Sequence, residues 1–269
     1  MRTQDSEASQ KPDGSLTRRN LFAAAAVVAS ALGASALGAR RANAGPGGTV
    51  GGGGQCYLAG THILTPDGPR EISQLKIGDS VITYSGQAQP IKWIGRNRFV
   101  RQSDGTWPAN ALPVKVARFA LDGQSPSADL YLSAGHALYV DGLLIQVGSL
   151  VNGETVTLDR AADRQVLEYF HLEVAGHDVI FAEGAAAETF LPSADHKLFD
   201  NWREYEALYG GGLPGQGKPF AAEIRLSGVR SHLRSRLRSA FAPWVDRRQP
   251  FDIVRDRLEQ RAQALRPAA

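Results

Sequence analysis

The chain has very little sulfur. Cys56 is the only cysteine and Met1 the only methionine among 269 residues. A single thiol excludes an internal disulfide, so the sulfur is buried, paired between chains or free for chemistry. One cysteine and dispersed histidines provide no ligand pair at a spacing typical of metal sites, and no cofactor is expected. We therefore look to Cys56 for any chemistry of the chain.

The chain also has no long, strongly apolar run. Residues 21–37 are mostly alanine and are interrupted by Gly33, whereas a membrane-spanning helix needs about 20 strongly apolar residues. Twin arginines precede this run in the string TRRNLF at residues 17–22. A membrane anchor is the alternative interpretation, but the pattern favours a twin-arginine signal peptide.

Small residues at 42–44 (ANA) have the spacing that leader peptidases cut. The sequence thus predicts a signal peptide over residues 1–44, cleaved between Ala44 and Gly45. The expected location is outside the bacterial cytoplasm, either periplasmic or secreted.

Charge of either sign is not in excess once this signal is removed. Of 30 basic and 27 acidic side chains, six and three lie in residues 1–44, so 24 of each remain. A net charge of zero gives no indication of a nucleic-acid partner. The charge is uneven, however. Residues 223–269 contain eleven arginines and five acidic residues, which leaves residues 45–222 negative by six.

Residues 56–190 show no pattern of a helix of normal length. Asp-Gly, Ser-Gly and Asn-Gly pairs recur at intervals of roughly ten to twenty residues and separate short β-rich runs. Several of these runs alternate apolar and polar residues. We therefore expect an all-β domain here, after a glycine-rich linker at 45–55, with one short helical turn at 71–75. The expected strands cover residues 80–84, 91–94, 114–119, 130–132, 138–140, 143–147, 154–158, 167–174 and 179–181.

The extension at residues 191–269 has a different pattern. A helix is expected over 197–209, ended by glycines, and is followed by a Gly/Pro-rich linker. Two arginine-rich stretches, 224–241 and 251–265, have apolar residues at helical spacing. The extension is expected to be helical and amphipathic. Contact with an acidic protein or a membrane surface and a solvated face packed on the body are both compatible with this pattern.

Cys56 stands where the linker meets the domain, at the start of the string CYLAGTHILTP. Its thiol can attack the preceding peptide bond if a base takes the thiol proton, an acid protonates the leaving nitrogen, and the bond is well placed. Ser133 and His136 lie in one predicted turn and can face the same buried peptide. His171 and His177 follow on a strand and turn, where a structural role is the favoured interpretation.

Three segments together resemble the Hint (Hedgehog/intein) domains. CYLAGTHILTPDGPREISQLKIGDSV at residues 56–81 resembles their opening block, and SAGH at 133–136 resembles the second block, with serine in place of threonine. YFHLEVAGHDVIFAEG at 169–184 resembles the later block. IKWIGR at 91–96 is similar to the bacterial subgroup. The resemblance covers about residues 55–190.

This resemblance implies a compact horseshoe of short strands with pseudo-two-fold halves. It also implies an N-to-S acyl shift, in which the Cys56 thiol attacks the carbonyl of Gln55 and converts the peptide bond into a thioester. Ser133 and His136 would activate the scissile amide, and His177 occupies the later histidine position.

Three departures from the family limit this chemistry. Residues 187–189 read Ala-Glu-Thr where splicing members have His-Asn and a nucleophile, so asparagine cyclisation has no residue to perform it. His171 stands where many members have an aspartate, so transfer to a sterol lacks its base. No folded N-terminal partner is present, and only residues 45–55 would leave the processed chain.

The sequence therefore predicts autoproteolytic cleavage between Gln55 and Cys56 without full splicing, with the chain's own N-terminal segment as substrate. Water or a small thiol would resolve the thioester. Two alternatives stay open. The first is a catalytically quiet Hint-fold module for binding or display. The second is a cysteine peptidase that acts on other proteins through Cys56 and His136.

Overall fold

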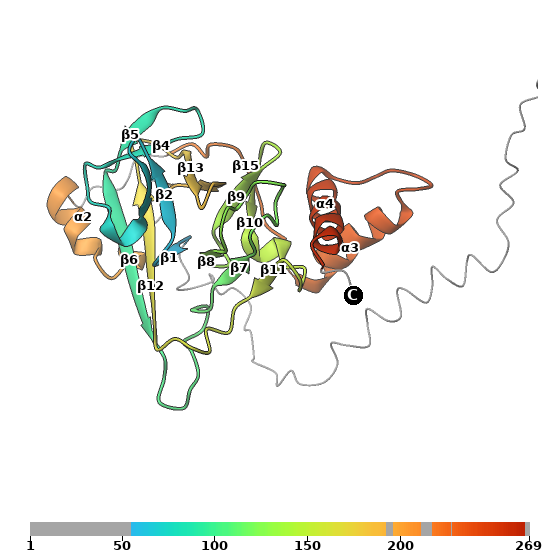
Figure 1. Cartoon of the computed structure of the whole chain (residues 1–269), viewed down its shortest axis with the longest axis horizontal. Helices are drawn as coiled ribbons and strands as arrows, with labels where there is room; N and C mark the ends of the chain where they lie inside the picture. The colour runs from blue at the N-terminus through green and yellow to red at the C-terminus, as the bar shows by residue number, and fades with distance from the viewer. Residues whose placement is uncertain (1–54, 192–195, 211–216, 227, 267–269) are drawn as a thin grey trace, which may run out of the picture. The chain divides into compact units, whose positions relative to one another are not determined.

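The structure is a computed structural model that describes residues 55–191, 196–210, 217–226 and 228–266 (Figure 1). The predicted signal peptide and most of the predicted glycine linker lie outside these residues. None of the described helices is long and apolar enough to cross a membrane.

Short strands dominate the chain as far as Glu188, and each of the nine predicted β-runs overlaps one of them. The predicted turn at 71–75 is the 3-10 helix η1 (Ile72–Gln74). The strands are β1 (Tyr57–Leu58), β2 (His62–Thr65), β3 (Gly68–Glu71), β4 (Ser80–Ile82), β5 (Ala88–Pro90), β6 (Trp93–Val100), β7 (Val114–Val116), β8 (Leu130–Leu132), β9 (Ala137–Val140), β10 (Leu143–Gln146), β11 (Val156–Leu158), β12 (Val166–Glu173), β13 (Val179–Ala182) and β14 (Ala185–Glu188).

The strand-rich domain agrees with the predicted all-β class. Among the described residues, one sheet has the strand order β11-β7-β8-β1-β12-β6 and a second has β15-β10-β9-β14-β13-β2-β3. A third, two-stranded sheet pairs β4 with β5. The longest pairing joins β12 to β6 in antiparallel register, from Val166 opposite Val100 to Glu173 opposite Trp93.

The chain crosses between the two large sheets at three places that matter for the site. Consecutive strands β1 and β2, β8 and β9, and β12 and β13 each lie in different sheets. The connections after β8 and after β12 therefore leave the first sheet and enter the second. Because β1 lies between β8 and β12, the residues at these crossings gather near the start of β1.

Apolar burial holds these sheets together. The main core contains side chains from both large sheets, among them Ile63, Leu132, Leu138 and Ile180, all of them fully buried. A second cluster surrounds Cys56 and consists of Leu58, Trp93, Ala111, Ala161, Leu167, Tyr169, Phe190, Phe199 and Tyr205. Cys56 thus lies inside a largely aromatic core.

The extension begins with η3 (His196–Leu198) and α2 (Trp202–Tyr209), which lie beside β6 (Figure 1). The contact depends on Gly95, because a Cβ atom there would lie 2.6 Å from the ring of Phe199. Helix α2 ends at Gly210, whose φ of +78° favours glycine.

The rest of the extension contains β15 (Ala222–Ile224), α3 (Gly228–Phe241) and α4 (Pro250–Ala264). Strand β15 pairs in parallel with β10 and was absent from the sequence prediction. Its three residues carry no periodic signal, and it forms by adding its backbone to a sheet edge. Helix α4 inserts Phe251, Val254 and Leu258 into the main core. Within its described residues, the extension is therefore a helical region with three α-helices, the 3-10 helix η3 and one added strand.

Candidate functional site at Cys56

The peptide unit at Cys56 is held from both sides by Ser133. The backbone N–H of Cys56 donates to Ser133 Oγ at 2.8 Å, and the carbonyl of Cys56 accepts from the Ser133 N–H at 2.9 Å. The hydroxyl thus contacts the nitrogen of the bond that the sequence analysis identified as scissile. The first bond holds the nitrogen of the Gln55–Cys56 amide, and the second holds the carbonyl of the following Cys56–Tyr57 amide, so both peptide units that flank the Cα of Cys56 are fixed.

The turn from Ser133 to His136 is fixed in its own right. The N–H of His136 donates to the Ser133 carbonyl at 3.0 Å, and the N–H of Gly148 donates to the Ala134 carbonyl at 2.9 Å. Gly148 approaches so closely that a Cβ atom there would lie 2.8 Å from the Ala134 oxygen. A residue without a side chain is required at this contact.

His136 lies fully buried between β1 and β12. Its ring centroid is 4.2 Å from that of Tyr57 and 5.3 Å from that of His171. Neither ring nitrogen makes a hydrogen bond of good geometry. Burial lowers the pKa of His136 to about 3, although the backbone of Gln55 and of Glu188 partly favours the protonated ring. At neutral pH the imidazole is therefore uncharged and free to accept a proton.

The Cys56 thiol is also uncharged at rest. The residue is 2 % exposed, and burial raises the pKa of its thiol far above the usual value. The thiolate is the nucleophilic form of cysteine. The site consequently holds a protonated thiol and a neutral imidazole, both enclosed, and has no charge that activates the sulfur in advance.

His171 occupies the middle of β12, opposite Gly95. Its ring is fully buried, with centroids 5.4 Å from Phe190 and 6.3 Å from Phe199. Burial, and then the proximity of His136, lowers the pKa of His171 well below its ordinary value. His171 is a neutral ring packed in the aromatic cluster next to His136.

His177 lies in the β12–β13 connection and faces a buried carboxylate. Its Nε2 is 3.4 Å from Glu188 Oε2, and its Nδ1 accepts the backbone N–H of Phe220 at 3.0 Å. Because Nδ1 accepts, the neutral ring carries its proton on Nε2, toward the carboxylate. His177 thus connects the end of β14 to the extension.

Glu188 is a site residue that the sequence analysis did not identify. Its Oε1 accepts the N–H of Ala137 at 2.6 Å, and its backbone carbonyl accepts the hydroxyl of Tyr57 at 2.7 Å. Burial raises the pKa of the Glu188 carboxyl, while His177 and Ala137 oppose that rise. Glu188 therefore links Tyr57, which follows Cys56, to Ala137, which follows His136, through hydrogen bonds to both.

A sequence signal for Glu188 was present. Glu188 stands in the string AAAETFL, between alanines and large apolar residues. A carboxylate that is buried in such surroundings requires polar partners. Residues 187–189 were considered only for the His-Asn pair that they lack. Tyr57 carried no such signal, because aromatic residues are common in strands.

Of the remaining histidines, His62 and His232 lie outside this site, whereas His196 packs on Phe190 and Trp93 of the cluster that contains Cys56. His62 is exposed and pairs with Glu183 at 3.0 Å. His196 is buried, and its Nε2 lies 2.7 Å from Glu173 Oε2. In the described residues, His, Cys, Asp and Glu side chains form no group of three that could hold a metal ion.

The sequence matches a family model described as the Hint domain over residues 55–194, slightly more than half of the chain. No curated protein matches the chain. Solved structures with a similar fold include a bacterial intein-like domain from Clostridium thermocellum, with 16 % identity, 51 % of this chain and 99 % of that chain covered, and a TM-score of 0.38. The gp41-1 intein has 14 % identity, 50 % and 98 % coverage, and a TM-score of 0.36.

Proposed function

Because the chain belongs to the Hint-domain family, we propose that it cleaves its own peptide bond between Gln55 and Cys56. The observation that carries this proposal is the hydrogen bond from the Cys56 N–H to Ser133 Oγ at 2.8 Å, which holds the nitrogen of that bond. His136, whose ring packs on Tyr57, supplies the acid and base. Cleavage ends without splicing.

The acyl shift moves one proton and one acyl group. The neutral His136 takes the thiol proton as the Cys56 sulfur bonds to the carbonyl carbon of Gln55. The resulting imidazolium returns the proton to the Cys56 nitrogen as the carbon–nitrogen bond breaks. The products are a thioester and a free α-amine, with no change in oxidation state. Water or a small thiol then releases residues that precede Cys56 and restores the thiol.

The protonation states at rest make this reaction slow. Moving a proton from the Cys56 thiol to His136 creates two charges in a buried cluster, and burial disfavours each of them. Once formed, however, an imidazolium of such low pKa is a strong acid toward the leaving nitrogen. We propose that cleavage is faster when a small thiol can resolve the thioester and draw the equilibrium forward.

A second step of splicing has no residue to perform it. Glu188 stands where splicing members have the residue that cyclises, and its carboxylate is engaged with Ala137 and His177. A carboxylate that accepts a backbone N–H at 2.6 Å is held in place as a structural acceptor. The proposed product is therefore a chain that begins at Cys56 and is not joined to another segment.

The test is the intact mass of the purified full chain, with and without dithiothreitol. Self-cleavage yields a product whose N-terminal residue is Cys56, formed faster with the thiol, and Cys56→Ala yields none. His62→Ala is the matched control, because His62 is exposed and lies outside the site. A cleavage that persists in Cys56→Ala would contradict the proposal.

A catalytically quiet Hint-fold module is the second candidate, and the enclosed, protonated thiol of Cys56 favours it. Such a module stays at full mass for days with dithiothreitol, and Cys56→Ala behaves as the parent chain does. Its thiol also resists alkylation until the domain unfolds. These three results together would assign the fold to binding or display.

We also propose that the protein is exported through its twin-arginine signal. N-terminal sequencing separates this processing from self-cleavage, since a signal peptidase leaves Gly45 and the acyl shift leaves Cys56. Replacing both Arg18 and Arg19 with lysine should retain the protein in the cytoplasm and abolish the Gly45 product. Export of the double variant at the parent's level would exclude the signal.

A further inference from the structure

Helix α3 carries a row of large apolar side chains that no described segment covers. Residues spaced four apart lie on one face of a helix. Val229 is 83 % exposed and Phe241 60 % exposed, at opposite ends of this row. We call the exposed set the α3 stripe, and it consists of Val229, Leu233, Leu237 and Phe241 of the helix together with Trp244 and Val245, which follow its C-terminal end. Contiguous exposed apolar side chains of this kind mark interaction surfaces.

The stripe ends in an aromatic hollow. Leu237, Phe241, Trp244 and Val245 line a cavity of about 420 Å³ together with Arg247 and Arg238. The ring centroids of Phe241 and Trp244 are 6.1 Å apart. Trp244 is 62 % exposed, which places a large amphipathic ring at the solvent boundary.

Arginines without a carboxylate partner accompany the stripe. Arg230 and Arg234 follow Val229 and Leu233 directly in α3, and Arg247 lines the hollow. All three are exposed, and none forms an ion pair within the described residues. Positive charge is therefore free next to the apolar side chains.

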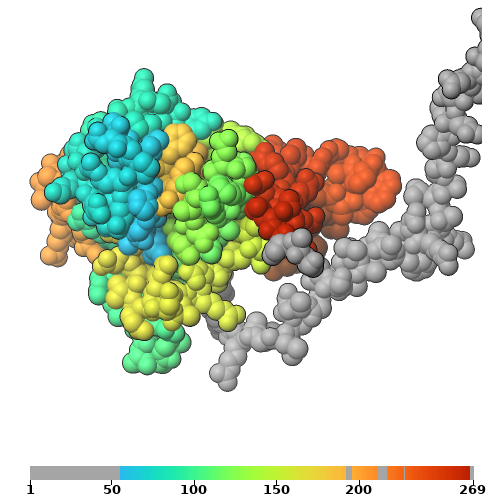
Figure 2. Space-filling view, in the orientation of Figure 1, coloured from blue at the N-terminus to red at the C-terminus, as the bar shows by residue number. Residues whose placement is uncertain are grey.

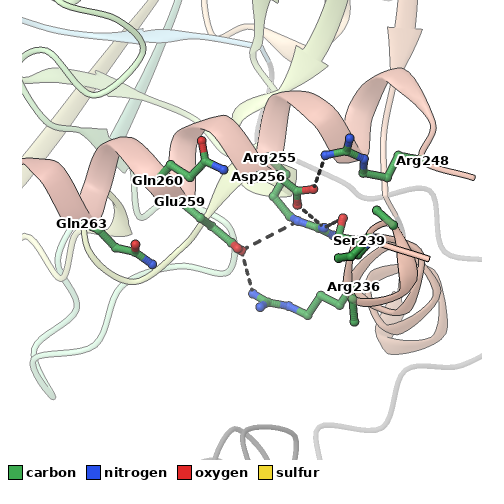
Figure 3. A pocket seen from close by; sticks show the side chains of 11 residues that line it. Arg236, Ser239, Arg248, Arg255, Asp256, Glu259, Gln260 and Gln263 are labelled. Carbon is green, nitrogen blue, oxygen red and sulfur yellow. Dashed lines mark hydrogen bonds and ion pairs between the residues drawn. The ribbon is translucent and has the colours of Figure 1, made fainter. Parts of the chain in front are cut away.

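The arginines in the groove between α3 and α4 differ, because they are neutralised by carboxylates. In the groove between α3 and α4, Arg236 lies 3.5 Å from Glu259, Arg255 lies 2.7 Å from Asp256 and Arg248 lies 3.5 Å from Asp256 (Figure 3). This groove of about 580 Å³ thus contains its own counter-charges. Figure 2 shows the atoms of the α3 and α4 region at the surface of the molecule. In contrast to these groove arginines, Arg230, Arg234 and Arg247 beside the stripe form no ion pair within the described residues.

We propose that the α3 stripe docks on the surface of a bilayer that contains anionic phospholipids. At such a surface, phosphates lie directly above acyl chains. This order matches a stripe in which Arg230 and Arg234 stand beside the apolar residues of α3, and Arg247 beside Trp244 in the segment that follows the helix. The helix lies flat on the surface, since it is too short and too polar to cross a membrane. Because α4 anchors the helix pair in the main core, docking leaves the Hint domain folded.

The fluorescence of Trp244 tests the proposal in the full chain. Residues 1–54 contain no tryptophan, so an emission change on vesicle addition does not come from the N-terminal segment. We expect a blue shift with vesicles of phosphatidylcholine and phosphatidylglycerol, weakened by salt. Trp244→Phe should remove the shift. Vesicle sedimentation of the same samples gives the affinity.

Charge and apolar variants separate the two parts of the surface. The triple change of Arg230, Arg234 and Arg247 to Gln should lower the affinity for anionic vesicles by about tenfold or more. Phe241→Ser should weaken binding to a similar degree. Matched controls are Arg160→Gln and Leu158→Ser, which alter an exposed arginine and a 55 % exposed leucine of the Hint domain. Circular dichroism confirms that each variant is folded.

Four results would overturn the proposal. Equal binding of the triple variant and the parent shows apolar adsorption rather than lipid recognition. A concentration-dependent doubling of mass that Phe241→Ser abolishes, without vesicle binding, assigns the stripe to a second copy of the chain. Binding to polyglutamate but not to vesicles assigns it to an acidic protein. A folded parent that binds none of these has no docking function at α3.

Discussion

The Cys56 site and the α3–α4 pair use polar side chains in opposite ways. At the site, His136 and the Cys56 thiol are enclosed without charge, because burial moves both pKa values toward the neutral forms. Between the helices, Asp252 is as fully buried but stays charged, since Arg238 Nε and Nη2 bind it at 2.5 and 3.0 Å. Burial alone thus does not decide protonation, and the available partner does.

This difference has a functional consequence. The Cys56–His136 pair has no resting charge and needs no counter-ion, and the imidazole can both accept and return a proton during one acyl shift. A buried ion pair has no such freedom, because removal of either member leaves an uncompensated charge. The first arrangement suits proton transfer, and the second suits the fixing of one helix against another.

The largest effect is expected when His136, the proposed proton carrier of the Cys56 site, is replaced. His136→Gln keeps a polar side chain of similar size but cannot carry a proton, so the rate of cleavage at Gln55–Cys56 should fall by about 10²- to 10⁴-fold. The rate is followed by intact mass in dithiothreitol. His62→Gln, an exposed position, should retain the parent rate. An unchanged rate in His136→Gln would leave the imidazole with a packing role only.

The second prediction concerns Asp252, whose buried charge holds α3 and α4 together. Asp252→Ala deprives Arg238, Ser235 and the N-terminal end of α4 of their common acceptor and should destabilise the helix pair by about 3 kcal/mol. Hydrogen exchange should accelerate in α3 and α4, while cleavage at Cys56 continues.

Asp246→Ala is the control for that change. Asp246 is exposed and pairs with Arg248 at the surface, where ion pairs contribute little. Exchange in this variant should match the parent. If both substitutions loosen the helices equally, the buried pair has no special role, and the contrast with the Cys56 site disappears.

The sequence predicted nine strands of the domain and missed five, namely β1, β2, β3, β5 and β14. All nine expected runs overlap strands, but β6 begins at Trp93 and continues to Val100 through the polar string GRNR. That part is stabilised by pairing with β12, which no local pattern reveals. Strand β14 was missed because its alanines have little β-propensity. The pseudo-two-fold relation of the halves stays a prediction.

Only the residues of the candidate site that belong to local sequence motifs could be predicted. Cys56, Ser133 and His136 lie in recognisable strings, and the structure brings the first two into direct hydrogen bonding. The contacts of Glu188 with Ala137 and Tyr57 span 51 and 131 residues of sequence. The sheet topology brings together residues that are so far apart in the sequence. The residues around Glu188 therefore do not indicate that Ala137 and Tyr57 are its partners.

Substitution of Gly148 tests how far the Cys56 site depends on the backbone of the turn from Ser133 to His136. In Gly148→Ala, the new Cβ would lie 2.8 Å from the Ala134 oxygen, so the turn that carries Ser133 must shift. We expect a loss of about 2 kcal/mol in the free energy of unfolding and slower cleavage. Gly123→Ala, where a Cβ meets nothing within 4 Å, should change neither quantity. A stable but slower Gly148→Ala variant would show that the turn geometry itself limits the reaction.

The smallest expected effect is the pH dependence that follows from the neutral His136. Its pKa is lowered to about 3 in the folded state, so the unfolded chain binds the proton first as the pH falls below the ordinary value of about 6.5. Stability contributed by the neutral ring is therefore present above pH 6.5 and is lost as the pH falls toward 3. Between pH 7.5 and 5.5 the loss is about 1.4 kcal/mol. Urea unfolding of the parent and of His136→Gln at both values should show the parent losing that much more than the variant. Equal losses would mean that the imidazole meets solvent in the folded protein, and the enclosed site would then resemble the exposed charges of the extension.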